Sequence, residues 1–247
     1  MIKQIPNIIT SLNLLCGCVA IMFAVSGDLV SASFFAFAGI FLDFFDGLAA
    51  RLLNAQSQVG LQLDSLADAV TSGVLPGIVM VQLLSEALTG NSLDINTMFN
   101  DTSKSLSIES YLPFLGLVIA VASAYRLAKF NVDTRQTTSF IGLPVPANTL
   151  LILSLPLIIS FQASQQMSDV ILAPWFLIII TLVSCVLLNA EIPLFGLKFK
   201  TWNFKDNAVR YLFLIASILL LVVLKFIAIP IIIFLYILVS LFWKPLD

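Results

Sequence analysis

Long apolar runs follow one another along the chain, separated by short polar stretches. A helix needs about 20 apolar residues to cross the hydrocarbon core of a bilayer. The pattern predicts about eight such helices, at positions 6–27, 29–51, 60–85, 111–130, 145–162, 171–189, 208–225 and 227–243. We therefore expect an all-α, polytopic transmembrane helix bundle. It forms a single membrane domain over residues 1–247, with a core at about 5–190 and two further helices at about 208–243.

The composition agrees with a membrane protein. Hydrophobic residues make up 60% of the chain and charged residues 11%, whereas the apolar share of a soluble globular domain is nearer half. The formal net charge is −2, which gives no indication of nucleic-acid binding. We expect the lipid bilayer to be the surroundings of the chain, and no nucleic-acid partner.

The basic residues are distributed unevenly between the polar stretches. Loops rich in Lys and Arg stay in the cytoplasm. If the N-terminus is cytoplasmic, most basic residues fall on that side: Lys3, Arg51, Arg126, Lys129, Arg135, Lys198, Lys200, Lys205, Arg210 and Lys244. Lys104 and Lys225 fall outside, and the exported segment 86–110 is acidic. We therefore expect an integral protein of the cytoplasmic (inner) membrane with a cytoplasmic N-terminus.

Four carboxylates lie well inside the predicted helices: Asp43, Asp46, Asp64 and Asp68. Ionisable groups at such depth are costly and usually mark a functional site or pathway. Spacings of three and four residues place each pair on one face of its helix. The polar turn "LLNAQSQV" joins the two helices, and each pair lies about 12 Å from it. The two pairs should therefore meet at one depth.

Four carboxylates at such close range cannot all ionise unaided, because like charges and desolvation both disfavour the charged form. Two divalent cations would neutralise all four. The chain has no His and no Cys near these positions, so an all-oxygen site favours Mg²⁺ first and Mn²⁺ next. Paired metals of this kind are typical of phosphoryl chemistry. A proton or cation pathway of a transporter is the alternative.

The residues beside the carboxylates fit a phosphate ligand. Gly47 and Gly60 leave the backbone bare where a bulky group must approach, and Ala50 keeps the face of Asp43 and Asp46 open. Arg51 offers a planar charged fork suited to a diphosphate. Alternatively, Arg51 simply anchors the cytoplasmic end of its helix.

The pattern Asp43-x2-Asp46-Gly47-x2-Ala50-Arg51-x8-Gly60-x3-Asp64-x3-Asp68 matches the signature of the CDP-alcohol phosphatidyltransferases. The segments "SLADAVTSGVLPG", "YRLAKFNVD" and "FIGLPVPA" are similar to those of the serine-using branch of that family. The resemblance covers most of residues 5–200. Thr71-Ser72, Tyr125 and Asn148 depart from the branch pattern, which leaves the chemistry intact but bears on the identity of the alcohol.

The resemblance implies transfer of a phosphatidyl group from CDP-diacylglycerol to the hydroxyl of L-serine, with release of CMP. It also implies a homodimer whose catalytic site opens to the cytoplasm. Since the chain has no His, a general base near the metals must be a carboxylate, and the resemblance assigns this role to Asp68. Asp43, Asp46 and Asp64 would hold two Mg²⁺ or Mn²⁺ ions, with Asp68 touching one of them.

Two further groups of residues are expected to bind the substrates. The residues expected to contact CDP-diacylglycerol are Gly47, Ala50, Arg51, Gly60, Asn7 and Thr10, although Asn7 could instead cap the first helix. The residues expected to contact serine are Arg126, Lys129 and Asn131, although basic residues at this position are also what topology demands. Glycerol 3-phosphate is the second candidate acceptor, as in a phosphatidylglycerophosphate synthase, and inositol phosphate the third.

Overall fold

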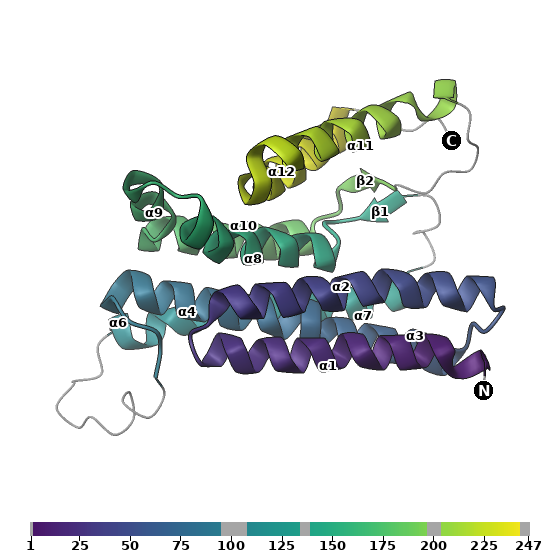
Figure 1. Ribbon diagram of the computed structural model, residues 1–247, viewed down its shortest axis with the longest axis horizontal. Helices are drawn as coiled ribbons and strands as arrows, with labels where there is room; N and C mark the ends of the chain where they lie inside the picture. The colour runs from purple at the N-terminus through teal and green to yellow at the C-terminus, as the bar shows by residue number, and fades with distance from the viewer. Residues whose placement is uncertain (1, 95–107, 134–138, 197–203, 243–247) are drawn as a thin grey trace.

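The computed structural model describes residues 2–94, 108–133, 139–196 and 204–242 (Figure 1). The described chain is almost wholly helical. Its α-helices are α1 (Ile5–Val25), α2 (Leu29–Leu52), α3 (Gln58–Asp68), α4 (Leu75–Thr89), α6 (Ile108–Tyr111), α7 (Val118–Val132), α8 (Val145–Phe161), α9 (Gln165–Ile171), α10 (Pro174–Asn189), α11 (Phe204–Leu224) and α12 (Ala228–Phe242). Shorter helical segments are η1 (Ile2–Gln4), η2 (Ala69–Val74), η3 (Leu112–Leu117) and η4 (Lys225–Ile227).

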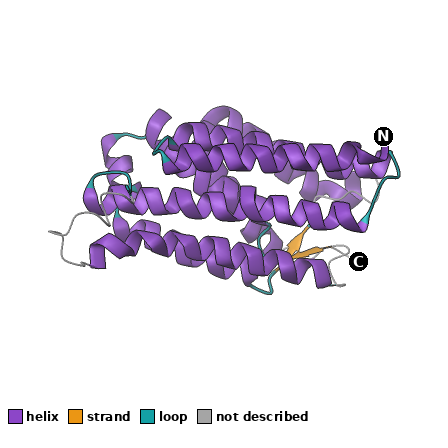
Figure 2. Ribbon diagram, turned by 90° about the horizontal axis from the view of Figure 1, so that it is seen from below, coloured by secondary structure: helices purple, strands orange, loops and turns teal. Residues whose placement is uncertain are grey.

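The axes of the long helices lie roughly along one line, and the helices form three layers (Figures 1 and 2). One layer holds α1 to α4 with α7, the next holds α8 to α10, and α11 with α12 lies outermost. The strands β1 (Ser139–Ile141) and β2 (Pro193–Phe195) pair antiparallel, with Phe140 opposite Leu194. This small pair lies at the same end of the bundle as the start of α1 and the turn between α2 and α3.

Local signals explain where the helices of the site begin. Asp28 precedes α2, and its side chain accepts a hydrogen bond from Ser31 N at 2.9 Å. The Ser31 side chain and this backbone bond together lower the pKa of the Asp28 carboxyl, which lies outside the apolar span. Ser57 caps α3 in the same way by accepting from Gly60 N at 3.0 Å. Each cap satisfies one backbone donor of the first turn.

A π-helical turn interrupts the third long helix directly after Asp68. In an α-helix, the N–H of residue 76 would donate to the carbonyl of Ser72. Residue 76 is a proline, which has no N–H, so this hydrogen bond cannot form. The carbonyl instead accepts a hydrogen bond of 2.8 Å from the Thr149 hydroxyl of α8. The π-turn η2 spans this region, and such turns are frequent at functional sites. The hydrogen bond from Thr149 to Ser72 O therefore ties the third helix to α8.

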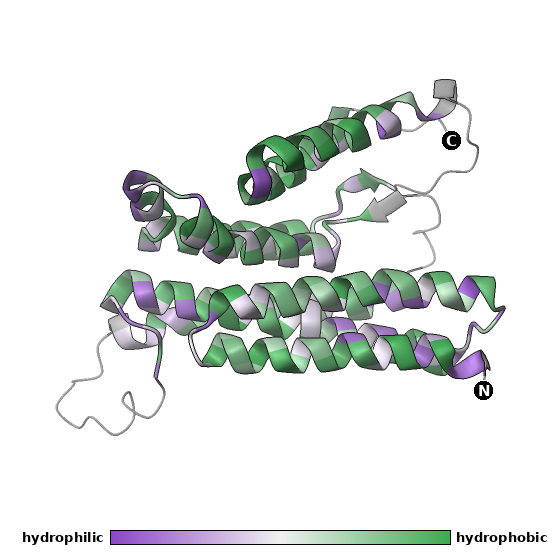
Figure 3. Cartoon of the chain, in the orientation of Figure 1, coloured by the Kyte–Doolittle hydropathy of each residue, from purple (hydrophilic) through white to green (hydrophobic). Residues whose placement is uncertain are grey.

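Small residues let the helices of the first layer approach closely. Ala20 and Ala24 of α1 and Ala32 and Ala36 of α2 are fully buried. Side chains this small allow backbone contact where there is no water to drive apolar association. Large apolar side chains cover much of the outer surface, and Figure 3 shows hydrophobic residues over most of the helical faces. This surface suits lipid.

The last two helices fold back on each other. Phe195 makes edge contacts with Phe213 of α11 and Tyr236 of α12, at centroid distances of 5.6 and 5.0 Å. The start of α11 therefore lies near the end of α12. Lys225, with a φ of +47°, lies between them at the turn. The two predicted helices at 208–225 and 227–243 thus correspond to an antiparallel hairpin.

The predicted all-helical class is confirmed. Five helical segments in the described residues are long and apolar enough to cross a membrane, or six if the bent pair α9 and α10 forms one span. The apolar helix α8, over Val145–Phe161, is shorter. Eight crossings and a cytoplasmic N-terminus stay predictions. Lys104, Arg135, Lys198, Lys200 and Lys244, on which the predicted orientation partly depends, lie outside the described residues.

The contact between η3 and α4 yields a test of the packing. A Cβ atom on Gly116 would lie 2.7 Å from Val81 N and 2.9 Å from Gly77 O, both backbone atoms. Gly116→Ala should therefore destabilise the protein by about 1–3 kcal/mol, as overpacked sites do, and lower the midpoint of thermal unfolding in detergent. Val121→Ala, at an exposed position of α7, is the control. Equal midpoints for the two variants would contradict the packing described.

Candidate active site

A cavity of about 540 Å³ opens between α1, α2 and α3, at the end of the bundle that carries the N-terminus. Helix α1 packs against both α2 and α3 and forms the third wall. The sequence analysis predicted that α2 and α3 face each other across their turn, and it also placed Asn7 and Thr10 of the first helix at the substrate. The cavity is lined by Pro6, Asn7, Thr10, Asp46, Gly47, Ala50, Arg51, Ala55, Gln56, Ser57, Gln58, Gly60, Leu61 and Asp64.

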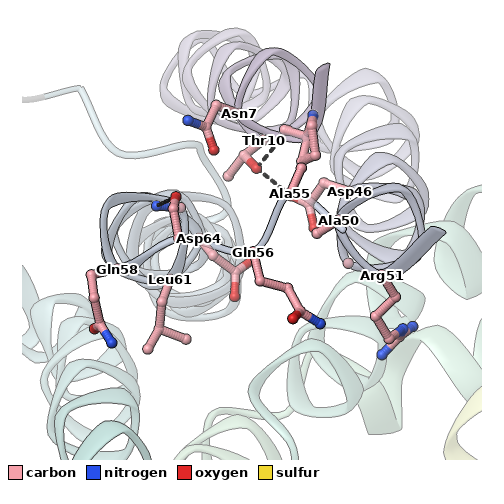
Figure 4. Close-up of a pocket in the computed structure, with 14 residues that line it drawn as sticks. Asn7, Thr10, Asp46, Ala50, Arg51, Ala55, Gln56, Gln58, Leu61 and Asp64 are labelled. Carbon is pink, nitrogen blue, oxygen red and sulfur yellow. Dashed lines mark hydrogen bonds between the residues drawn. The ribbon is translucent and has the colours of Figure 1, made fainter. Parts of the chain in front are cut away.

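Three of the four predicted carboxylates come together. One carboxylate oxygen from each of Asp43, Asp46 and Asp64 lies within 4.8 Å of the others. Figure 4 shows Asp46 and Asp64 reaching from two helices toward the same space. Oxygen atoms at this separation can bind one cation together, since Mg²⁺ binds its ligands at about 2.0–2.1 Å. The predicted meeting of the acids of α2 with Asp64 at one depth is confirmed.

Helix α1 supplies hydrogen bonds that orient two of these carboxylates. The Thr10 hydroxyl donates to Asp46 Oδ2 at 2.5 Å, and Asn13 Nδ2 donates to Asp43 Oδ1 at 3.2 Å. Asp46 is only 6% exposed, so the Thr10 hydroxyl is an important hydrogen-bond donor to its carboxylate. The sequence analysis named Thr10 as a substrate contact and overlooked Asn13. The signal that could have identified Asn13 was its position in an otherwise apolar helix, three residues after Thr10.

Asp68 lies one helical turn after Asp64, just before the π-turn. Its carboxylate is not part of the group of three mutually close oxygens. Coulomb interactions nevertheless link it with Asp43, Asp46 and Asp64, and also with Arg126 of α7. Asp68 therefore lies near the carboxylate cluster and near one cation. Its role as a base stays a prediction.

The six residues predicted to contact CDP-diacylglycerol all line the cavity. A Cβ atom on Gly47 would meet nothing within 4 Å, whereas one on Gly60 would come within 3.0 Å of Asn7 Oδ1. Gly47 therefore faces open space, and Gly60 lets α1 approach α3. The alternative that Asn7 caps the first helix is wrong, because Gln4 is the capping position and Asn7 donates to Gln4 Oε1.

Polar side chains of the α2–α3 turn also line the cavity, and the sequence analysis did not single them out. Gln56 and Gln58 border it together with Ser57. In Figure 4 the Gln56 side chain extends below Asp46 and Asp64, and the exposed side chain of Arg51 lies at the rim. Their contribution depends on the course of the turn, which residue spacing alone does not specify.

The three residues predicted to bind serine lie on α7, and none lines the large cavity. Arg126 is 7% exposed, and its charge interacts with Asp68. Lys129 forms an ion pair of 3.2 Å with Glu191. Asn131 Nδ2 donates to Ser65 Oγ at 2.9 Å, which joins α7 to α3. Arg126 is thus the one of the three linked electrostatically to the carboxylates.

Comparison with known proteins adds independent evidence. The family model described as CDP-alcohol phosphatidyltransferase matches residues 3–187. A CDP-diacylglycerol–serine O-phosphatidyltransferase of Bacillus subtilis (strain 168) is 38% identical over 149 residues, which cover 58% of this chain and 70% of that protein. An enzyme of the same description from Helicobacter pylori (strain J99) is 30% identical over 149 residues, covering 60% and 54%. One from Mycobacterium tuberculosis (strain H37Rv) is 29% identical over 201 residues, covering 78% and 61%.

The hydrogen bond from Thr10 to Asp46 can be tested through metal affinity. Thr10→Val keeps the shape of the side chain and removes the donor, so Asp46 should be less well oriented. We expect about tenfold weaker Mn²⁺ binding by titration calorimetry, as for other residues that hydrogen-bond a metal ligand. Ser11→Ala is the matched control, because the Ser11 hydroxyl donates only to the backbone oxygen of Asn7. Unchanged Mn²⁺ affinity in Thr10→Val would contradict this role.

Proposed function

The chain belongs to the CDP-alcohol phosphatidyltransferase family, and from this premise we propose that it makes phosphatidylserine. In this reaction the phosphatidyl group of CDP-diacylglycerol passes to the hydroxyl of L-serine, and CMP leaves. The proposal is supported above all by the three close carboxylates, two of which, Asp46 and Asp64, line an open cavity. Family membership weighs against the alternative of a cation transporter.

The chemistry of the proposed transfer is a single substitution at phosphorus. The serine hydroxyl oxygen attacks the phosphorus atom that carries diacylglycerol, and a new P–O bond forms. The P–O bond to the CMP phosphate breaks, and CMP takes the bonding electrons. The hydroxyl proton passes to the carboxylate of Asp68, which then releases it to water. Asp68 suits this role because it lies beside the cluster but is not one of its three mutually close members.

Asp43, Asp46 and Asp64 would hold the divalent metals, with Asp68 touching one of them. The all-oxygen set fits Mg²⁺ or Mn²⁺. Bound metals would supply charge neutralisation at the phosphates and at the leaving CMP. Two ions are proposed because four carboxylates at close range need about four positive charges to remain ionised together.

The cavity suits the nucleotide half of CDP-diacylglycerol. Gly47 and Ala50 leave room along α2, and Gly60 does so along α3, while Arg51 at the rim can pair with a diphosphate oxygen. Asn7 and Thr10 supply polar contacts from α1. Leu52 and Val59 flank the α2–α3 turn as strongly exposed apolar residues, so the acyl chains can remain in lipid. We place this mouth at the cytoplasmic face of the inner membrane.

The pairing of Lys129 with Glu191 favours serine over phosphate-bearing acceptors. Glycerol 3-phosphate and inositol phosphate would need several free cations close together, whereas Lys129 is paired with Glu191. Arg126 remains to bind a single carboxylate, with Asn131 held nearby on the same helix. The relatives described as serine phosphatidyltransferases support the same acceptor. A homodimer is proposed from the family resemblance.

One assay tests both the acceptor and the metal requirement. Purified protein with CDP-diacylglycerol and Mg²⁺ or Mn²⁺ should release CMP and form labelled lipid from L-serine. EDTA should abolish this activity, and added Mg²⁺ or Mn²⁺ should restore it, because the carboxylate cluster cannot bind phosphates without cations. Glycerol 3-phosphate and inositol phosphate serve as comparison acceptors. Product from glycerol 3-phosphate with none from serine would overturn the acceptor, and full activity without metal would overturn the metal site.

The base can be separated from the metal ligands by substitution. Asp68→Asn should lower turnover by about 10² or more, the usual contribution of a positioned base, and leave CDP-diacylglycerol binding largely intact. Asp43→Asn and Asp64→Asn should weaken Mn²⁺ binding as well. Turnover and Mn²⁺ affinity are measured on the same preparations. Near-normal turnover of Asp68→Asn at saturating metal would refute the assignment.

Arg126 can be tested by a substitution that keeps its charge. A guanidinium can bind a carboxylate through two parallel hydrogen bonds, and an ammonium group cannot reproduce this geometry. Arg126→Lys should therefore raise the KM for serine by about tenfold and change the KM for CDP-diacylglycerol much less. Steady-state kinetics with each substrate varied in turn measure both constants. An unchanged serine KM would move the acceptor pocket away from Arg126.

A further inference from the structure

The Arg126 guanidinium is buried with one of its donors unused. Its Nε atom is inaccessible to solvent and has no hydrogen-bond partner among the described residues. The side chain is 7% exposed, and the guanidinium carbon lies 5.9 Å from the centre of the Phe130 ring. The ring face attracts the positive charge but leaves the Nε–H without an acceptor. A buried donor without an acceptor is costly, so a partner is expected at this point.

A matching acceptor lies on the last residue of α10. Asn189 Nδ2 donates to the backbone oxygens of Ala122 and Cys185, at 3.2 and 3.3 Å. These two bonds fix which end of the amide is nitrogen, so Oδ1 must point elsewhere. Oδ1 is buried and has no partner within the described part of the chain. Because Ala122 lies one helical turn before Arg126, the amide is held beside the right part of α7.

Arg126 and Asn189, which carry the two unpaired groups, line the same small space. A cavity of about 10 Å³ is lined by Arg126 and Asn189, with Lys129, Ile141, Leu188 and Ala190 around them. About 10–15 Å³ is the space that one water molecule requires. The donor and the acceptor are also complementary, since a water oxygen can accept from Nε–H while one of its hydrogens is donated to Oδ1. Size and polarity therefore both select a single water.

We propose that Asn189 is a positioning residue for Arg126, acting through one water molecule that bridges Arg126 Nε and Asn189 Oδ1. The inference rests on the proposed role of Arg126 at the acceptor site. A bond at Nε fixes the plane of the guanidinium, which leaves the two terminal nitrogens to face Asp68 and the carboxylate of the acceptor. On the neighbouring side, Lys129 forms an ion pair with Glu191.

The test compares serine kinetics in variants that remove the acceptor atom. Asn189→Leu keeps the approximate volume and deletes Oδ1 together with the Nδ2 donor to Ala122 O and Cys185 O, so the guanidinium plane is no longer fixed. We expect the KM for serine to rise about tenfold, the effect of losing one hydrogen bond to a charged group. The KM for CDP-diacylglycerol and the turnover at saturating serine should change less than twofold. Asn189→Ala serves the same purpose if the larger side chain prevents folding.

Gln162→Leu is the matched control for general loosening of the bundle. The Gln162 amide also joins helices, because it donates to Leu224 O and accepts from Phe226 N. It directly follows the last residue of α8, at the end of the bundle opposite the β1–β2 pair. This variant should lower the midpoint of thermal unfolding without a selective rise in the serine KM. A selective serine effect in Gln162→Leu equal to that in Asn189→Leu would overturn the proposal.

A double substitution separates positioning from an independent effect. If Asn189 acts through Arg126, the serine KM of Arg126→Lys with Asn189→Leu should match that of Arg126→Lys alone, since coupled residues are not additive. Multiplied effects would overturn the inference. If Arg126→Lys raises the serine KM and Asn189→Leu does not, only the inference fails. If neither variant changes it, the proposed acceptor pocket fails as well. An experimental structure should also place an ordered water between Arg126 Nε and Asn189 Oδ1, and a dry space would contradict the bridge.

Discussion

Repulsion between carboxylates in a membrane interior is the constraint on which the site depends. Asp43, Asp46 and Asp64 approach within 4.8 Å of one another, an arrangement that is unfavourable without opposing charge or hydrogen-bond donors. The surrounding structure supplies donors from α1 and a cation from α7. It also leaves an open cavity that water, ions and phosphates can enter. The placement of α1 and α7 around α2 and α3 can be understood from this need.

The same constraint explains which features the sequence could predict. Helical spacing alone placed the carboxylates of α2 together with Asp64, because turns of 3.6 residues and one short connection determine their depth. Gly47, Gly60 and Arg51 were found for the same local reason. The all-helical class followed from the length of the apolar runs. The site residues between positions 43 and 68 lie close together in the sequence, so their spacing alone was sufficient to find the site.

Other features depend on residues far apart in the chain. Glu191 neutralises Lys129 across 62 positions, and no spacing rule connects them. Asn131 was assigned to serine, but its amide bonds Ser65 of α3. Thr149 supplies the donor that Pro76 cannot, although the effect of Pro76 on its own helix could have been anticipated. Each of these pairings depends on how the helix layers pack against one another. The periodicity of residues along the chain does not predict that packing.

The π-turn after Asp68 has a consequence for how this chain can diverge. Each residue of an α-helix turns the following side chains by about 100°, so a change in the number of residues between Asp68 and Pro76 that the turn did not absorb would rotate all of α4. Its fully buried residues Leu75, Val79 and Leu84 would then lose their present neighbours while Asp68 kept its place. Evolution can therefore exchange side chains in this turn more readily than it can change the number of residues, and insertions or deletions should be rarer here than in the polar turn before α3.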